Sequence, residues 1–263
     1  MAFNRFFLKC GITVLIATTS SCQDLQNSDQ NLPTEKESVA NKETKNKVDL
    51  ETNPAYSDLK RKNATSLMQL GLVNVRSINS SIYVELKYAT ADNFMKMKLY
   101  DTLTHAFLQE DVALRLSKCQ EFLNDHYGDF HLLIYDAVRP ISVQKKMWIA
   151  LDSIPISERS KFVSNPANGS IHNYGAAVDL TICNAQGVAL DMGAGYDDIR
   201  KIAYPSLELQ FLKSGELSKQ QLENRKMLRN VMESQNFRNI PTEWWHFNAC
   251  SRSTAKAKYK PLY

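Results

Sequence analysis

The chain has 263 residues, of which 43% are hydrophobic, and it carries a formal charge of +4 with an isoelectric point near 8.7. It is long enough to bury a sizeable core, and at about 150 residues per domain it forms one large domain or two small ones. Because Lys and Arg are interspersed with Asp and Glu instead of gathering in a stripe, the composition argues against a nucleic-acid partner.

The first 22 residues have the layout of an export signal. Arg5 and Lys9 precede an apolar run over residues 10–17, too short to span a bilayer, and small residues then lead to Cys22. The ending Ser-Ser-Cys resembles a bacterial lipoprotein signal, in which Cys22 would be lipidated and become the mature N-terminus. The alternative is an ordinary export signal with a chance cysteine. We expect an exported cell-envelope protein, anchored in the membrane through Cys22 and facing the periplasm.

A polar spacer is predicted over residues 23–63, because Gln, Asn, Ser, Lys, Glu and Thr dominate there and aromatic residues are almost absent. The folded domain is therefore expected over residues 64–263. If Cys10 is removed with the signal, this domain holds the remaining free cysteines, Cys119, Cys183 and Cys250. Their odd number and wide spacing leave room for one disulfide, but buried free thiols are expected for Cys119 and Cys183.

The predicted elements of the domain begin with a strand, a turn and a strand. Apolar residues alternate with polar ones over residues 73–75 and 82–86, on either side of the turn-forming Asn-Ser-Ser at residues 79–81. Helical spacing of apolar residues predicts a helix over residues 104–126 that ends before Gly128. An apolar run predicts a buried strand over residues 130–135, and another helix is expected over residues 143–151.

The second half of the domain begins with the loop SNPANGS, which leads into a strand over residues 178–182 with period-two alternation. Residues 187–199 are loop-like, and a helix is predicted over residues 218–234. The final segment, FRNIPTEWWHFNAC, favours β structure, and Pro241 marks the entry to it. Strands interleaved with helices, with antiparallel connections, predict a single α+β domain.

Candidate metal ligands are few, since the chain has only five histidines. A catalytic zinc ion typically takes three protein ligands and leaves a fourth position for water. His172 and Asp179 stand on either side of a short turn, so the histidine can fold back toward the aspartate on the following strand. A carboxylate between Val178 and Leu180 is costly to bury without a cation or strong hydrogen bonds. The alternative is that Asp179 caps the turn or faces solvent.

A second cluster, EWWHF, places Glu243 and His246 among aromatic residues. Such surroundings desolvate a carboxylate and raise its pKa toward the range of a general base, while the imidazole could hold a metal. In a regular strand, however, residues three apart point to opposite faces, so both could reach one metal only across a bulge or bend. The alternative is a buried structural histidine in an aromatic strand.

Arg139 follows Asp136 at the end of the predicted strand over residues 130–135. An arginine in a dry site can neutralise the oxyanion that forms when water attacks a carbonyl. Its alternative role is a structural ion pair with Asp136 or a contact at the start of the next helix.

These residues resemble a known family. Residues 170–179 form S-x-H-x-x-G-x-A-x-D, and with the E-x-W-H of residues 243–246 this resembles the zinc D-Ala-D-Ala-directed peptidases, which include carboxypeptidases and dipeptidases. The segments ELKYATADNF, YDAVRP and ALDMGAGYDD look like the D-alanyl-D-alanine dipeptidase branch, the VanX type. The resemblance covers nearly all of residues 70–250 and leaves out the signal and spacer, which the cytoplasmic resistance enzymes of this branch lack.

The resemblance implies a site and a fold. It implies that one zinc ion per subunit is held by His172, Asp179 and His246, that Glu243 is the general base, and that Arg139 stabilises the tetrahedral intermediate. Ser170, from the same motif, would help to hold the substrate. The implied fold is a compact α+β domain with a central antiparallel sheet flanked by helices and the zinc site on the sheet, which requires a bend in the E-x-x-H segment.

The function expected from this resemblance is hydrolysis of D-Ala-D-Ala or a related D,D-dipeptide in peptidoglycan turnover in the cell envelope. The nearest alternative is a D,D-carboxypeptidase that trims peptidoglycan stem peptides. A third is a non-catalytic envelope binding domain of the same fold, although such a module has no need of Glu243 beside a ligand histidine.

Overall fold

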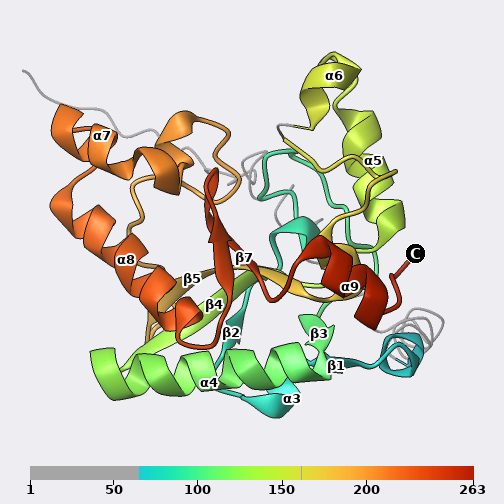
Figure 1. The fold of residues 1–263 in the computed structure, drawn as a ribbon, viewed down its shortest axis with the longest axis horizontal. Coiled ribbons are helices and arrows are strands. Elements are labelled where there is room, and N and C mark those ends of the chain that lie inside the picture. Colours follow the sequence, from blue (N-terminus) through green and yellow to red (C-terminus); the bar gives the residue numbers. More distant parts are fainter. Residues whose placement is uncertain (1–64, 161) are drawn as a thin grey trace, which may run out of the picture. The chain divides into compact units, whose positions relative to one another are not determined.

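The computed structural model describes residues 65–160 and 162–263. Its main sheet contains both parallel and antiparallel pairs of strands (Figure 1). Within that part of the chain its five strands lie in the order β2 (Tyr83–Val84), β4 (Phe130–Asp136), β5 (Ala177–Asn184), β7 (Glu243–Asn248) and β6 (Arg238–Ile240). The pairs β4–β5, β5–β7 and β7–β6 are antiparallel, whereas the short β2 runs parallel to β4. The predicted α+β class is confirmed, and β2 is the one departure from an antiparallel sheet.

A separate two-stranded sheet corrects the predicted start of the domain. β1 (Leu72–Asn74) pairs with β3 (Phe107–Gln109) and not with β2. The expected continuation of the first strand through Val75 is wrong, because the Asn74 side chain accepts a hydrogen bond from the Arg76 amide and caps α3 (Val75–Ile78). The helix expected over residues 104–126 is wrong in its first part, since residues 107–109 are buried and form a strand.

The long helices agree with the expectations from sequence. Helix α4 (Glu110–Tyr127) ends at Gly128 and packs against β4 and against α8 (Lys219–Glu233), which begins with a capping box on Ser218. Helix α5 (Ile141–Ala150) follows β4 after a short loop. The shorter helices were not predicted: α6 (Ile156–Arg159), α7 (Glu208–Ser214), α9 (Arg252–Lys258), and the 3₁₀ turns η1 (Lys87–Ala89), η2 (Ile171–Tyr174), η3 (Lys201–Ala203) and η4 (Pro205–Leu207).

Strand β5 lies at the centre of the main sheet and is buried on both faces. Val178, Leu180 and Ile182 are fully buried in the core on one face. The alternating polar positions are buried as well, with Asp179 only 3% exposed and Thr181 fully covered. Asp179 therefore does not point to solvent, and its charge needs compensation inside the protein.

Cys119 and Cys183 are buried free thiols, as predicted, and Cys250 is also free, so the described residues form no disulfide. In the same part of the chain, no helix combines the length and the apolar character that crossing a membrane requires. The predicted signal, Cys22 and the spacer over residues 23–63 lie outside the described residues and stay predictions.

Candidate active site

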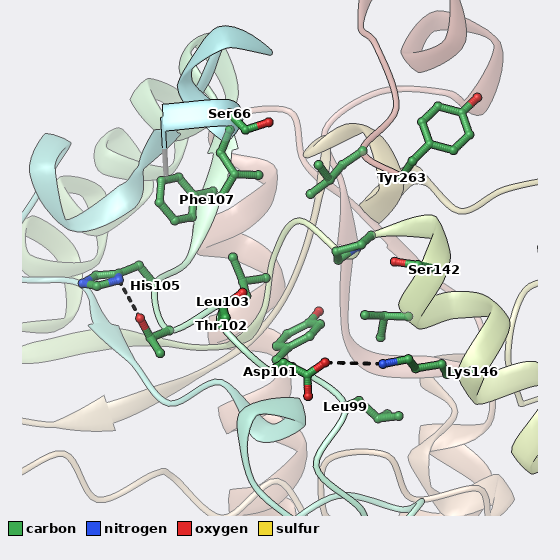
Figure 2. Close-up of a pocket in the computed structure, with 16 residues that line it drawn as sticks. Ser66, Leu99, Asp101, Thr102, Leu103, His105, Phe107, Ser142, Lys146 and Tyr263 are labelled. Atoms are coloured by element: carbon green, nitrogen blue, oxygen red, sulfur yellow. Dashed lines mark hydrogen bonds and ion pairs between the residues drawn. The ribbon is translucent and has the colours of Figure 1, made fainter. Parts of the chain in front are cut away.

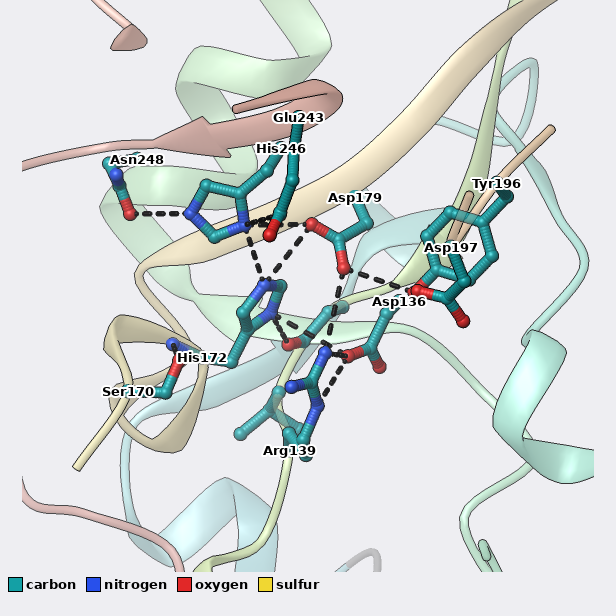
Figure 3. Close-up of polar contacts among 12 residues, drawn as sticks. Asp136, Arg139, Ser170, His172, Asp179, Tyr196, Asp197, Glu243, His246 and Asn248 are labelled. Atoms are coloured by element: carbon teal, nitrogen blue, oxygen red, sulfur yellow. Dashed lines mark hydrogen bonds and ion pairs between the residues drawn. The ribbon is translucent and has the colours of Figure 1, made fainter. Parts of the chain in front are cut away.

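Three ligand atoms from distant parts of the chain converge on one point (Figure 3). Oδ1 of Asp179 lies 2.9 Å from Nδ1 of His246 and 3.2 Å from Nε2 of His172, and these two ring nitrogens are 3.1 Å apart. Ligands bonded to zinc at about 2.1 Å in tetrahedral geometry lie about 3.4 Å from one another. The spacing and the two-imidazole, one-carboxylate donor set therefore fit a zinc ion with an open fourth position.

The position of His172 is fixed by the turn η2. The Ser170 side chain caps this turn by accepting the His172 amide, and Gly175 ends it in the left-handed conformation, with φ of 64°. A Cβ atom at Gly175 would lie 2.3 Å from Cδ2 of Leu72, so no larger residue fits there without movement. Nδ1 of His172 donates to the carbonyl oxygen of Ala137 at 2.6 Å, which leaves Nε2 free to bind a metal.

Asp179 and His246 face each other across neighbouring strands, because they form a register pair between β5 and β7. Oδ2 of Asp179 accepts from the Tyr196 hydroxyl at 3.1 Å and lies 3.5 Å from the Arg139 guanidinium, so Oδ1 alone is turned to the histidines. Burial acts to raise the pKa of Asp179, but both histidines lower it well below its usual range. The carboxylate is thus held ionised, as a metal ligand must be.

His246 is oriented from its other side. Its Nε2 donates to Oδ1 of Asn248 at 2.9 Å, which leaves Nδ1 for the metal position. Burial acts to lower the pKa of His246, but the hydrogen bond and charge of Asp179 raise it to about 9. A proton and a metal ion therefore compete for the same nitrogen, and a divalent cation would displace the proton.

The bend expected between Glu243 and His246 is present. Strand β6 pairs Asn239 with Phe247 and the next residue, Ile240, with Glu243, so residues 244–246 of β7 stand opposite a single step of β6. This large bulge brings Oε2 of Glu243 to 4.0 Å from Nδ1 of His246, and Figure 3 shows both side chains at the metal position. The departure from regular strand geometry removes the objection that period-two alternation raised.

Glu243 has the surroundings of a proton acceptor. Its side chain retains 33% exposure, while Trp245 lines the same pocket. Desolvation of the carboxyl raises the pKa of Glu243, in opposition to the lowering effect of His246 beside it. A raised pKa brings a carboxylate nearer to the range in which it can take and return a proton at neutral pH.

Arg139 forms the ion pair with Asp136 that was considered from sequence, and it also lines the pocket. Its Nε and one terminal nitrogen donate to Oδ2 of Asp136 at 2.9 and 2.6 Å, and Tyr100 donates to the other oxygen of that fully buried carboxylate. Burial acts to lower the pKa of Arg139, but Asp136 raises it well above its usual range, so the guanidinium stays charged. The ion pair holds Arg139 at the wall of the pocket, 8% exposed.

These side chains line one cavity of about 170 Å³, to which Ser170 and Asp197 also contribute. Asp197 is a further buried carboxylate. Its Oδ1 accepts from the Tyr88 hydroxyl at 3.1 Å, whereas its Oδ2 has no hydrogen-bond partner among the described residues. Desolvation and the nearby Asp179 raise the pKa of Asp197 well above its usual range. A cationic group placed at the unpaired oxygen would favour the ionised form of Asp197, so this position beside Glu243 suits such a group.

A larger cavity, of about 520 Å³, lies elsewhere and carries none of this chemistry (Figure 2). Its walls are mainly apolar, including Leu99, Phe107 and Val143, and an ion pair joins Lys146 to Asp101 at 3.4 Å across an exposed rim. None of its lining residues belongs to the metal-binding group, the one such group found in the described part of the chain. Size alone therefore does not locate the site.

The structure brings together all the site residues named from the sequence of the domain: Ser170, His172, Asp179, Glu243, His246 and Arg139 all line the smaller cavity. Sequence reasoning missed Asp197, Tyr196 and Asn239, which complete the pocket or its support. Asp197 and Tyr196 lie in ALDMGAGYDD, a segment whose resemblance was noted without a role for either residue. Asn239 had no distinguishing signal, because its role depends on the register of β6 and β7.

Comparison with known proteins gives consistent results. The family model described as D-ala-D-ala dipeptidase matches residues 68–260. The D-alanyl-D-alanine dipeptidase of Escherichia coli is 33% identical over 179 residues, which make up 67% of this chain and 83% of the relative. That of Synechocystis is 27% identical over 168 aligned positions, and the match covers 54% of this chain and 68% of the relative.

Among solved structures, a vancomycin resistance D,D-pentapeptidase, VanY, in complex with Zn(II), aligns with 60% of this chain and 81% of its own. The sequence identity is 10% and the TM-score is 0.30. At that level of likeness the match supports no inference about this chain.

Proposed function

Because the chain belongs to the D-ala-D-ala dipeptidase family, we propose that it is a zinc-dependent peptidase that hydrolyses D-Ala-D-Ala or a closely related D,D-dipeptide. The observation that carries this proposal is the convergence of His172, Asp179 and His246 within 3.2 Å of one another, with Glu243 beside them. A binding module that only held a ligand would have no use for a desolvated carboxylate next to the metal position.

The proposed ligands are Nε2 of His172, Oδ1 of Asp179 and Nδ1 of His246, which would hold one zinc ion per chain. Zinc bound there supplies Lewis-acid activation of water and of the peptide carbonyl. The protein contributes the orientation of each ligand, through Ala137 behind His172, Tyr196 behind Asp179 and Asn248 behind His246. Such supporting hydrogen bonds fix the tautomer and direction of the ligands.

Glu243 and Arg139 would carry out the remaining chemistry. Glu243 takes a proton from the attacking water as the water oxygen bonds to the carbonyl carbon, and the carbonyl oxygen gains negative charge. The charged Arg139 guanidinium, fixed at the pocket wall by Asp136, stabilises that oxygen. Glu243 then returns the proton to the amine as the C–N bond breaks, and two amino acids leave.

Asp197 favours a dipeptidase over a carboxypeptidase. The carboxylate with an unpaired oxygen shares the cavity with Glu243, so a short substrate with a free amino terminus can place its ammonium group there. A stem peptide carries an acylated nitrogen at the equivalent position and offers no charge to Asp197. The loss of that pairing would leave a buried carboxylate uncompensated.

The test is a substrate panel on the zinc-loaded protein. We expect turnover of D-Ala-D-Ala, loss of turnover with a chelator and its recovery with zinc, and little or no turnover of N-acetyl-D-Ala-D-Ala or of a muropeptide pentapeptide. Release of free D-alanine is the measurement. Equal rates on the dipeptide and the pentapeptide would identify a carboxypeptidase instead, and zinc binding without turnover of any of them would support a binding domain.

We further propose that the protein is exported, lipidated on Cys22 and held in the cell envelope facing the periplasm, where it would act in peptidoglycan turnover. The support is the sequence of residues 1–63, with its basic start, short apolar run, Ser-Ser-Cys and polar spacer. Labelling with a radioactive fatty acid should mark the parent and not Cys22→Ser. Release of the parent into the soluble periplasmic fraction would contradict the anchor.

A further inference from the structure

The bulge in β7 has a hydrogen-bonding partner of its own on the neighbouring strand. Residues 244–246 stand outside the regular β6–β7 ladder, which resumes at the pairs of Asn239 with Phe247 and Ile240 with Glu243. Backbone carbonyls in and next to such a bulge lose regular partners on the side that faces β6, and they need others where water is excluded. In this structure the side chain of Asn239 supplies them.

The Asn239 amide nitrogen donates to the carbonyl oxygens of Glu243 and His246, both at 2.8 Å. The Trp244 carbonyl lies farther away, at 3.4 Å. An amide group has two N–H donors, so the two short bonds account for both of them. One side chain therefore ties together the backbone of the two residues whose side chains meet at the metal position.

We propose that Asn239 is a positioning residue for the reaction: its amide holds the bulge of β7 closed, so that Glu243 and His246 face the same metal ion. The proposal rests on the proposed function for the role of Glu243, although its effect on His246 concerns metal binding alone. Asn239 touches neither the ligand atoms nor the cavity. It acts by setting the path of the backbone between Glu243 and His246.

The property of Asn239 that holds the bulge is its pair of N–H donors more than its size. A regular strand would place residues 243 and 246 on opposite faces of the sheet, so the site exists only while the bulge persists. Strand β6 lies at the edge of the main sheet and is three residues long, so its backbone alone can do little to hold the shape of β7. Without the amide, the carbonyls of Glu243 and His246 would have no shared donor to draw them together.

The experiment compares Asn239→Ala with Asn124→Ala as a matched control. Asn124 also donates through its side-chain amide to two backbone carbonyls, of Gly128 and Phe130, but it lies at the end of α4, outside the site. For each variant we would measure zinc affinity by competition with a chromogenic chelator, kcat and KM for D-Ala-D-Ala, and the thermal midpoint of the metal-free protein.

We expect Asn239→Ala to bind zinc about 10- to 100-fold more weakly, in the range found when supporting partners of metal ligands are removed. We also expect kcat of the zinc-saturated variant to fall at least about tenfold, with a smaller change in KM, because Glu243 loses its alignment with the water. Asn124→Ala should leave zinc affinity and kcat within about twofold of the parent, even if it lowers the thermal midpoint as much.

A second variant, Asn239→Asp, separates the donor from the volume. Aspartate has nearly the same shape but, when ionised, cannot donate to either carbonyl, so we expect the same losses as in Asn239→Ala. Retention of zinc affinity and kcat in either folded variant, or equal losses in Asn124→Ala, would overturn the proposal. If the parent binds zinc but does not cleave dipeptides, the proposed function fails, while the difference in zinc affinity still tests Asn239.

Discussion

Two cavities in the described part of the chain differ in size and in chemistry. The larger, about 520 Å³, is mainly apolar, and its ion pair between Lys146 and Asp101 lies on an exposed rim. The smaller, about 170 Å³, contains His172, Asp179 and His246 within hydrogen-bond distance of one another. Their walls come close in sequence, since Arg139 lines the smaller cavity and Pro140 the larger.

The difference shows what makes a pocket reactive. Buried charge is costly, so a protein retains several charged groups in one small cavity only where they compensate one another or a ligand. Among the buried carboxylates and histidines that line the smaller cavity, one oxygen of Asp197 has no hydrogen-bond partner. The substitutions below test whether function follows this concentration of charge, and they run from the largest expected effect to the smallest.

Glu243→Gln should have the largest effect on turnover. Glutamine keeps the shape of the side chain but cannot accept a proton from water, so we expect kcat for D-Ala-D-Ala to fall about 10²- to 10⁴-fold. Zinc content, measured by metal analysis of the purified protein, should stay at one per chain because Glu243 is not a proposed ligand. A variant that retains turnover within a few-fold, with zinc bound, would contradict its role as the base.

Asp197→Asn should have an intermediate effect, confined to substrate binding. The change removes the negative charge that faces the proposed position of the ammonium group, so KM for the free dipeptide should rise about tenfold, or ~1.4 kcal/mol. The kcat value should change less than KM, because Asp197 does not contact the reacting atoms. Steady-state kinetics on D-Ala-D-Ala measure both, and an unchanged KM would mean that the amino terminus binds elsewhere.

Lys146→Ala, in the larger cavity, should have the smallest effect. The Lys146 side chain is 58% exposed and its partner Asp101 is 76% exposed, so their ion pair is screened by solvent and contributes little. We expect kcat, KM and zinc content within about twofold of the parent. A rise in KM as large as that expected for Asp197→Asn would show that the larger cavity takes part in the reaction. It would contradict the view that the chemistry is confined to the smaller cavity.

The sequence predicted the chemistry of the site better than its support. His172 and Asp179 are close in sequence, and Glu243 and His246 lie in one aromatic segment. Spacing alone left alternatives open for both pairs, and the family resemblance implied that they share one zinc site. Residue types also identified the charged groups, since few histidines were available. The geometry of the site, in contrast, depends on strand register. The pairing of β5 with β7 places Asp179 opposite His246, and the register shift between β6 and β7 brings Glu243 toward His246. Register is set by packing across the whole sheet.

The fold was predicted well where periodicity was strong and poorly where strands were short. The helix over residues 218–234 and the strand over residues 178–182 were found within about two residues of their bounds. The pairing of β1 with β3 was missed, because a strand of three residues gives no reliable period and its partner lies far along the chain. Asp197 was missed for a related reason, since the folding of a loop buries it.

The contact between Gly175 and Leu72 has a consequence for the order of folding. The η2 turn that presents His172 rests on the small sheet, and the Gln109 side-chain amide and backbone amide donate to the carbonyls of Tyr174 and Gly175. Segments on the order of 100 residues apart must meet before that turn is supported, and such contacts form late. We therefore expect the chain to acquire its metal after it has folded, unlike small zinc modules in which the metal drives folding.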